Sequence, residues 1–306
     1  MEHNPDLVVE TKNLTKRFGK IIAVDELSIE VFRGEVFGFL GPNGSGKSTT
    51  MGMILGLIAP TSGSVSVFGL DVTHHLPDIL SRTGALTEST GFYPYLSGYE
   101  NLRYFARITG GISGSRIEEV LEMVDLKSRA NDPFSNYSLG MKQRLGLASA
   151  LLGDPEFIIL DEPTNGLDPA GMKEIRELIT LLGQQGKTVF LNSHLLHEVQ
   201  QVCDRVAIIK KGRVITQGSV KELLNQTHVL QVKTTQTDDA FNLLSGMDWL
   251  KNISRNEERI LLEVEPEYAY KVSAVLAEKG IYLTEMKYRE NTLEDLFLEL
   301  TGEAAI

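Results

Sequence analysis

Cysteine and tryptophan each occur once among the 306 residues of the chain. The single cysteine, Cys203, excludes a disulfide within the chain and favours a reducing compartment. Long apolar runs are also missing: the longest extends from Met51 to Ala59, whereas a transmembrane helix needs about 20 apolar residues. We therefore expect any association with a membrane to depend on a protein partner.

Positive charge is scarce as well. Lysine and arginine number 30 against 41 aspartates and glutamates, so the formal net charge is −11. A surface with this excess of acid repels nucleic-acid backbones and anionic lipids, which argues against nucleic acid as a partner. The remaining composition, 42% hydrophobic and 23% charged, is typical of a globular protein with one large or two modest domains.

The chain is organised around a glycine-rich segment that fits the phosphate-binding pattern G-x-x-x-x-G-K-[ST], which is called the P-loop. Its residues are Gly41, Pro42, Asn43, Gly44, Ser45, Gly46, Lys47 and Ser48. The apolar run 35–40 predicts a buried strand before it, and a helix is predicted over 47–57. In that context the backbone N–H groups and the helix dipole bind phosphate. Lys47 would reach the β- and γ-phosphates, and Ser48 would hold Mg²⁺.

Two strands are predicted before this loop, over residues 7–18 and 21–32. Together with residues 64–68 they are expected to form a small antiparallel layer. Phe18 stands just before the turn at Gly19-Lys20. From the residues alone, it fits an ordinary half-buried strand position.

A second apolar strand, over residues 157–160, delivers the adjacent carboxylates Asp161 and Glu162. In a P-loop protein this arrangement is expected to hold Mg²⁺ and to supply a general base; the competing interpretation is a pair of solvated loop acids. A third strand, 188–192, leads to His194 at the sheet edge where open α/β folds bind ligands. The histidines here lack the H-E-x-x-H order, so we do not expect a zinc site.

A glycine-flanked helical block, about residues 89–155, lies between the loop and the second strand, and we interpret it as an insertion. It contains helices predicted over 98–108 and 115–126. A further helix begins after Ser138, a favourable N-cap residue that by itself requires no other role.

The composition changes after the last of these motifs. Residues 227–306 are predicted to fold in the order β-α-β-β-α-β-α, which is that of a ferredoxin-like unit. We therefore expect two domains: a nucleotide-binding domain over residues 7–226 and an accessory α+β domain over 227–306.

Read as a set, the motifs resemble those of the nucleotide-binding subunits of ABC transporters, and they occur in the family order: Lys47, Ser138–Gly140, Asp161-Glu162, Asp168 and His194. The resemblance covers about residues 7–220. It implies an α/β P-loop NTPase cassette with a mostly parallel core sheet, an antiparallel β layer and a helical insertion. The ferredoxin-like domain would follow this cassette.

The resemblance also implies roles for individual residues, with ATP and Mg²⁺ as cofactors. Phe18 would stack on adenine, and Thr49 would support the α-phosphate. Asp161 would hold the Mg²⁺ shell while Glu162 activates the attacking water. His194 would contact the γ-phosphate.

Three further residues would act between two subunits. Ser138 and Gly140 match the signature segment that contacts the γ-phosphate held by the opposite subunit. Asp168 matches the end of the loop that communicates between the two subunits.

Two positions depart from the family pattern. The usual signature L-S-G-G-Q reads Tyr137–Met141 here, which keeps the serine and the second glycine and is similar to exporters paired with ABC-2-type permeases. The family also places a glutamine after the strand that follows the P-loop helix. No glutamine occurs before Gln143, and Glu88 stands at that position. This feature resembles bacitracin- and lantibiotic-resistance exporters, in which Glu88 would face the γ-phosphate and Mg²⁺; the alternative is a solvated loop acid.

The resemblance thus implies an ATPase subunit, two copies of which close head to tail on two ATP molecules and drive a separate permease. Its partners would be an ABC-2-type membrane permease and a second, identical or paralogous, nucleotide-binding subunit. It would lie in the cytoplasm on the inner face of the membrane. The implied task is export of an antimicrobial peptide, drug or similar amphiphile. The alternative is a soluble ABC-type ATPase that acts on a target such as the ribosome.

Overall fold

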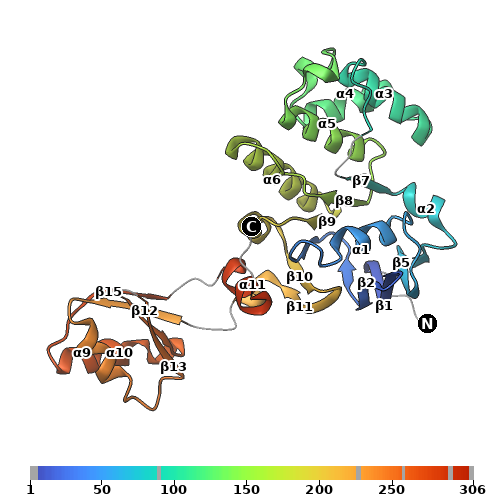
Figure 1. Cartoon of the computed structure of the whole chain (residues 1–306). Helices are drawn as coiled ribbons and strands as arrows, with labels where there is room; N and C mark the ends of the chain where they lie inside the picture. Colours follow the sequence, from blue (N-terminus) through green and yellow to red (C-terminus); the bar gives the residue numbers. More distant parts are fainter. Residues whose placement is uncertain (1–5, 88–90, 225–228, 257–258, 289–291, 303–306) are drawn as a thin grey trace. The chain divides into compact units, whose positions relative to one another are not determined.

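The computed structural model describes residues 6–87, 91–224, 229–256, 259–288 and 292–302. The chain forms two compact units (Figure 1). The first contains residues 1–220 together with 297–306, and the second contains residues 221–296. Among the described residues, no helix has the length and apolar character that crossing a membrane requires.

The first unit is built on a mostly parallel sheet. Its described strands follow the order β11-β10-β4-β9-β8-β7, and only β11 runs antiparallel to its neighbour. The strands are β4 (Val36–Leu40), β7 (Thr83–Leu86), β8 (Phe157–Asp161), β9 (Thr188–Asn192), β10 (Arg205–Lys210) and β11 (Arg213–Ser219). Because β4, β8 and β9 are adjacent and parallel, the segments that follow them meet at one edge of the sheet.

An antiparallel layer forms beside this sheet, as the sequence predicts, with β1 paired to β2, β3 and β5. Its strands are β1 (Leu7–Phe18), β2 (Ile21–Leu27), β3 (Glu30–Phe32), β5 (Ser62–Val67) and β6 (Leu70–Asp71). The expected strand 21–32 is thus two strands. The Thr11 hydroxyl explains the break, because it donates to the Leu27 carbonyl and accepts from the Ile29 N–H, replacing ladder hydrogen bonds.

The helix after the P-loop packs between the two sheets. The first unit contains α1 (Lys47–Ile54), α2 (Leu76–Leu80), α3 (Gly98–Thr109), α4 (Gly114–Met123), α5 (Leu139–Leu151), α6 (Pro169–Gln184) and α7 (Leu196–Val202), with 3₁₀ turns at Lys127–Arg129 and Phe134–Asn136. Met53 of α1 shares one buried cluster with Phe37 and Phe190 of the core sheet and Val67 of the antiparallel layer. The helix ends before the predicted Leu57, since Gly56 adopts a φ of 68°.

Helices α3, α4 and α5 gather into a layer of their own between β7 and β8 in the chain (Figure 1). Ser97 begins α3 with a capping box, in which its hydroxyl accepts from the Glu100 N–H and the Glu100 carboxylate accepts from the Ser97 N–H. Ser138 caps α5, because its hydroxyl accepts from the Met141 N–H at 3.2 Å. The helical insertion that the sequence predicts is present.

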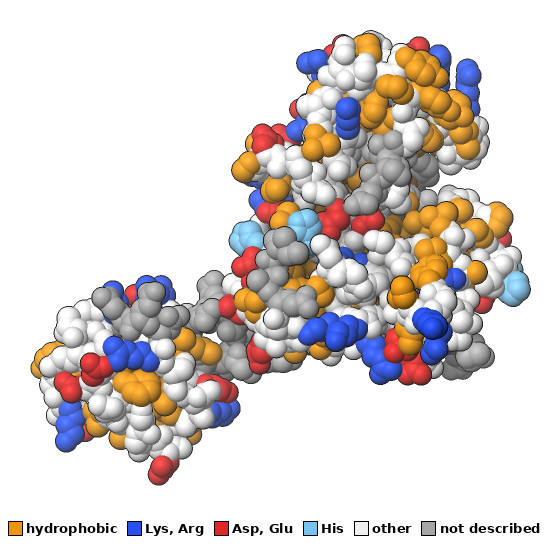
Figure 2. Space-filling view, viewed as in Figure 1, with side chains coloured by type: hydrophobic (Ala, Val, Ile, Leu, Met, Phe, Trp, Pro, Cys, Tyr) orange, Lys and Arg blue, Asp and Glu red, His pale blue; other side chains and the backbone are white. Residues whose placement is uncertain are grey.

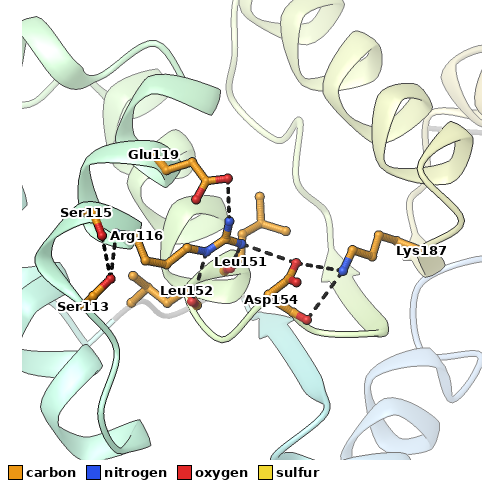
Figure 3. A network of polar contacts seen from close by, with 8 residues as sticks. All are labelled: Ser113, Ser115, Arg116, Glu119, Leu151, Leu152, Asp154 and Lys187. Atoms are coloured by element: carbon orange, nitrogen blue, oxygen red, sulfur yellow. Dashed lines mark hydrogen bonds and ion pairs between the residues drawn. The ribbon is translucent and has the colours of Figure 1, made fainter.

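A polar network ties the far end of α5 to the core sheet (Figure 3). Arg116 of α4 donates to the carbonyl oxygens of Leu151 at 2.8 Å and Leu152 at 3.3 Å, which satisfies acceptors that the end of a helix leaves open. The Asp154 carboxylate lies 3.6 Å from Arg116 and pairs with Lys187, just before β9, at 2.8 Å. The hydrogen bond from Lys187 lowers the pKa of Asp154.

The second unit has the ferredoxin-like order that the sequence predicts. Its antiparallel sheet runs β13-β14-β12-β15, and α9 and α10 contribute to its buried core. Its elements are β12 (Val229–Thr234), α9 (Thr237–Leu244), β13 (Asn252–Asn256), β14 (Arg259–Glu263), a 3₁₀ turn (Pro266–Tyr268), α10 (Ala269–Glu278) and β15 (Leu283–Tyr288), preceded by α8 (Val220–Leu224).

The last helix, α11 (Leu293–Thr301), spans the division between the units. Residues from Phe297 onward belong to the first unit, where Phe297 is buried and the Lys210 ammonium donates to the Thr301 carbonyl. The compact units therefore divide near residues 220 and 296, whereas the sequence places one boundary at 226/227.

Candidate nucleotide site

Two glycines of the P-loop adopt conformations that a side chain would disfavour. Gly44 has a φ of 75° and Gly46 a φ of 105°. A Cβ atom at Gly46 would also collide with the carbonyl oxygen of Ala23 in β2. The glycines therefore let the loop turn tightly and lie directly against the antiparallel layer, with the N-terminus of α1 at its end.

The turn between β10 and β11 is hydrogen-bonded to this loop and to β2. Gly212 donates its N–H to the Ser45 carbonyl at 2.9 Å, and its own carbonyl accepts from the Asp25 N–H at 2.9 Å. Arg213 pairs with the Asp25 carboxylate at 2.8 Å. The P-loop is thus fixed between β2 and the β10–β11 hairpin.

Lys47 supplies the positive charge of the site. Its ammonium donates to the carbonyl oxygens of Gly41 at 2.7 Å and Pro42 at 3.2 Å, and the residue is 8% exposed. Burial lowers the pKa of Lys47, while the charges of Glu162 and Asp161 act in the opposite direction. A buried ammonium between two carboxylates and the P-loop is suited to hold a phosphate group.

Asp161 ends β8 and Glu162 follows it, and both residues contact Asn192 at the end of β9. The Asn192 side-chain amide donates to the Asp161 carboxylate, and its main-chain carbonyl accepts from the Glu162 N–H at 2.9 Å. Parallel pairing places Asp161 opposite Asn192 in the sheet register. The sequence predicted the carboxylates but not the role of Asn192, since the pairing of β8 with β9 cannot be seen in either strand alone.

Glu162 has a backbone φ of 49°, an uncommon value for a residue with a side chain. The conformation is held by the bond to Asn192 and by the Glu162 carbonyl, which accepts from the Asn165 N–H at 3.1 Å. The carboxylate oxygen Oε2 lies 2.7 Å from Nδ1 of His194. The structure thus brings together the acid and the histidine that the sequence singled out.

The P-loop, Lys47 and the two acids line one cleft with the end of β1 and the start of β2. The lining residues are Phe18, Ile21, Ile22, Ala23, Asn43, Gly44, Gly46, Lys47, Ser48, Thr49, Asp161, Glu162 and Asn192. Phe18 is 49% exposed, and the Lys16 ammonium lies 5.0 Å from its ring centroid. A half-exposed ring on one wall and a phosphate loop on the other are suited to a nucleotide. Sequence reasoning missed Ile21 and Ile22, although both follow the turn after Phe18.

Seven of the described residues that the sequence predicted for the site are not in the lining of this cleft: Gly41, Pro42 and Ser45 of the P-loop, His194, Ser138, Gly140 and Asp168. The last three lie away from the P-loop in the chain and have contacts of their own. Ser138 is the N-cap of α5, and Asp168 is the N-cap of α6, where its carboxylate accepts from the Gly171 N–H at 3.0 Å. Gly140 lies near Leu167, since a Cβ there would be 3.4 Å from the leucine side chain. A further predicted residue, Glu88, lies outside the described residues.

The donor set of the cleft fits a magnesium ion that is bound together with a nucleotide. Asp161 and Ser48 offer oxygen ligands, whereas the described residues contain no group of three or more His, Cys, Asp or Glu that could hold a metal. Mg²⁺ is usually held by one or two carboxylates plus substrate phosphates and water. The residues present therefore suit Mg²⁺ only with phosphate oxygens in its shell.

The fold and this cleft define a P-loop nucleoside triphosphatase. A family model described as ABC transporter matches residues 24–165. An uncharacterized ABC transporter ATP-binding protein of Bacillus subtilis is 43% identical over 97% of this chain and 96% of its own length. The bacitracin transport ATP-binding protein BcrA of Enterococcus faecalis is 36% identical over 98% of both. The chain belongs to the ATP-binding proteins of ABC transporters and is an ATPase.

Solved structures agree on the first unit. An ATP-binding cassette in a dimeric post-hydrolysis state, bound to ADP and Pi, superposes with a TM-score of 0.63 at 29% identity; the match covers 69% of this chain and 98% of that one. The ATP-binding subunit of another ABC transporter gives a TM-score of 0.65 at 29% identity, over 72% of this chain and 92% of its own. Relatives such as BcrA match nearly the whole chain, so they share the C-terminal unit as well.

Proposed function

We propose that the cleft binds Mg²⁺-ATP. Phe18 provides the surface for adenine, and the P-loop, ending in Lys47, surrounds the phosphates. Ser48 and Asp161 hold Mg²⁺, which when bound neutralises charge on the phosphates. Glu162 accepts a proton from the attacking water, and the 2.7 Å contact with His194 orients its carboxylate. The observation that supports this assignment is the convergence of the ring, the ammonium and the carboxylates on one cleft.

We further propose that two subunits complete each other's sites. Ser138 and Gly140 begin α5 outside the cleft of their own chain, at a helix N-terminus suited to bind an anion. Contact with the γ-phosphate of a second subunit would give them such an anion. Hydrolysis would then require a dimer, in which Asp168 lies at the junction.

We propose that the partner in the membrane is an ABC-2-type permease. Its binding would hold this subunit at the inner face of the membrane. An exposed apolar surface on and before α3 supports this: Tyr95 is 74% exposed, Ile108 65% and Tyr104 41%. Hydrophobic side chains gather over the helical layer on the face shown in Figure 2. A contiguous apolar surface of this kind is typical of a protein–protein contact.

The transported compound is proposed to be an antimicrobial peptide or similar amphiphile. This rests on relatives whose names state such a role, namely BcrA and the linearmycin resistance ATP-binding protein LnrL of Bacillus subtilis, which is 34% identical over 96% of this chain. The C-terminal unit, which these relatives share, would regulate or steady the dimer.

The test is resistance conferred on a sensitive host. The tagged chain is purified in gentle detergent, the co-purifying membrane protein is identified, and both are expressed together. We expect higher inhibitory concentrations for a panel of peptide antibiotics with the parent chain but not with Glu162→Gln. Co-sedimentation with ribosomes and no membrane partner would instead favour the soluble ATPase.

A further inference from the structure

Asn192 contacts both acidic residues of the cleft, yet one of its own polar atoms has no partner. The residue is 2% exposed at the end of β9 and lines the cleft. Its Nδ2 donates to Oδ1 of Asp161, and its main-chain oxygen accepts from Glu162. Its side-chain oxygen Oδ1 is buried and finds no hydrogen-bond donor among the described residues.

The chemistry of Asp161 decides which way this amide is turned. An ionised carboxylate only accepts hydrogen bonds, so the NH₂ group of Asn192 must face it and the carbonyl oxygen must face elsewhere. An amide donor holds the carboxylate in one orientation without neutralising its charge. A buried acceptor that lacks a donor is unfavourable, and in a cleft it calls for a donor from a ligand or from ordered water.

We infer that Asn192 is a positioning residue for the metal. Its NH₂ group orients the carboxylate of Asp161 toward Mg²⁺, and its Oδ1 accepts a hydrogen bond from a water molecule of the hydrated ion. Mg²⁺ retains several water molecules in nucleotide complexes, and each of them is a donor. The inference rests on the proposed Mg²⁺-ATP site and adds a residue that tunes metal affinity from outside the ligand shell.

The test separates metal affinity from nucleotide affinity in the full chain. Mn²⁺ is titrated into protein saturated with a non-hydrolysable ATP analogue, and free Mn²⁺ is followed by electron paramagnetic resonance. Analogue binding is measured separately in EDTA. Asn192→Leu keeps the approximate shape but removes both polar atoms, so Mn²⁺ affinity should fall about 10- to 100-fold, the usual effect of losing such an outer partner. Analogue affinity in EDTA should be unchanged.

Ser193→Ala is the matched control. Ser193 is equally buried at the same strand end, and its hydroxyl accepts from the Leu195 N–H at 3.1 Å. This variant should retain the parent's Mn²⁺ affinity. If Asn192→Leu does not fold, Asn192→Ser decides, since it removes the amide with little change in packing; a smaller loss of Mn²⁺ affinity is expected.

Two outcomes would overturn the inference. Unchanged Mn²⁺ affinity in a folded Asn192 variant shows that the residue does not act on the metal. If Mn²⁺ affinity and the affinity for the analogue in EDTA fall by the same factor, the residue only shapes the cleft. Failure of the parent chain to bind the analogue would instead contradict the proposed nucleotide site itself.

Discussion

Glu162 is held in place by its backbone as well as by its side chain. Its φ of 49° and its contact with His194 aim one carboxylate at the cleft that Lys47 also lines. We expect Glu162→Gln to retain ATP binding and to lower turnover by about 10²–10⁴, the usual worth of a general base. Phosphate release and nucleotide binding measure the two effects, and an ATP-bound dimer should accumulate. Glu177→Gln, at a surface acid of α6, is the control; hydrolysis near the parent rate in the Glu162 variant would refute the assignment.

Leu139 and Gly166 form a contact that neither motif reveals alone. Gly166 has a φ of 73°, and a Cβ there would lie 2.5 Å from a methyl group of Leu139. The departure from the family signature thus places a leucine against a glycine of the neighbouring loop. Gly166→Ala should destabilise the protein by about 1–2 kcal/mol through backbone strain, with more from the collision.

A double-mutant cycle separates these two causes. Adding Leu139→Ala should recover the part of the loss that comes from the collision and leave the part that comes from the backbone. Unfolding in urea gives the free energies. Strict additivity of the two substitutions would show that the contact has no energetic consequence.

At the scale of elements, Glu156 joins the start of β8 to two other segments. Arg82 lies 2.7 Å and Arg33 2.8 Å from its carboxylate, and the hydrogen bonds from both lower the pKa of Glu156 to about 2. The carboxylate therefore stabilises the folded state above its unfolded pKa, and this contribution is lost as the pH falls from about 4.5 toward 2. The side chain is 43% exposed, so solvent screening keeps the effect small.

Glu156→Gln removes this charge and so measures what the ion pairs with Arg82 and Arg33 contribute to stability. The difference in unfolding free energy between parent and variant should be constant from neutral pH down to about pH 4.5 and should shrink below it. Urea unfolding at a series of pH values measures it. A difference that does not change with pH would trace the loss to packing rather than to charge.

At the scale of the whole molecule, the polypeptide leaves the first unit near residue 220, forms the C-terminal unit and returns to the first unit near residue 296. We expect a chain truncated after Gln226 to bind ATP as the parent does, because every cleft residue precedes that point. It should melt at a lower temperature, since truncation removes Phe297, which is 4% exposed, and the contact of Thr301 with Lys210. Phe297→Ala should reproduce part of this destabilisation and lower the free energy of unfolding by up to about 3 kcal/mol.

Calorimetry and nucleotide titration distinguish these effects. A truncated chain that folds but has lost ATP affinity would show that the C-terminal unit contributes to the site. A melting temperature equal to the parent's would show that α11 adds nothing to the first unit.

Much of the fold could be predicted because its signals are local. The apolar run before the P-loop, the serine that caps α5 and the strand-and-helix alternation after residue 227 are each readable within a few residues. The prediction of one continuous strand over residues 21–32 was wrong, because the structure has two strands there. The break between them depends on Thr11 of the neighbouring strand, which no local pattern of residues 21–32 contains.

By itself, the sequence determined the chemistry of this protein: a P-loop, two carboxylates after a buried strand and a histidine after the next, in a fixed order. The tertiary structure decided which groups act on one another. It placed Asn192 beside Asp161, Leu139 against Gly166, and the end of α11 beside Lys210. These contacts join residues that are distant in the chain, or whose meeting depends on strand register and backbone conformation. Motif spacing cannot specify them, because strand pairing and packing form only when the whole unit folds.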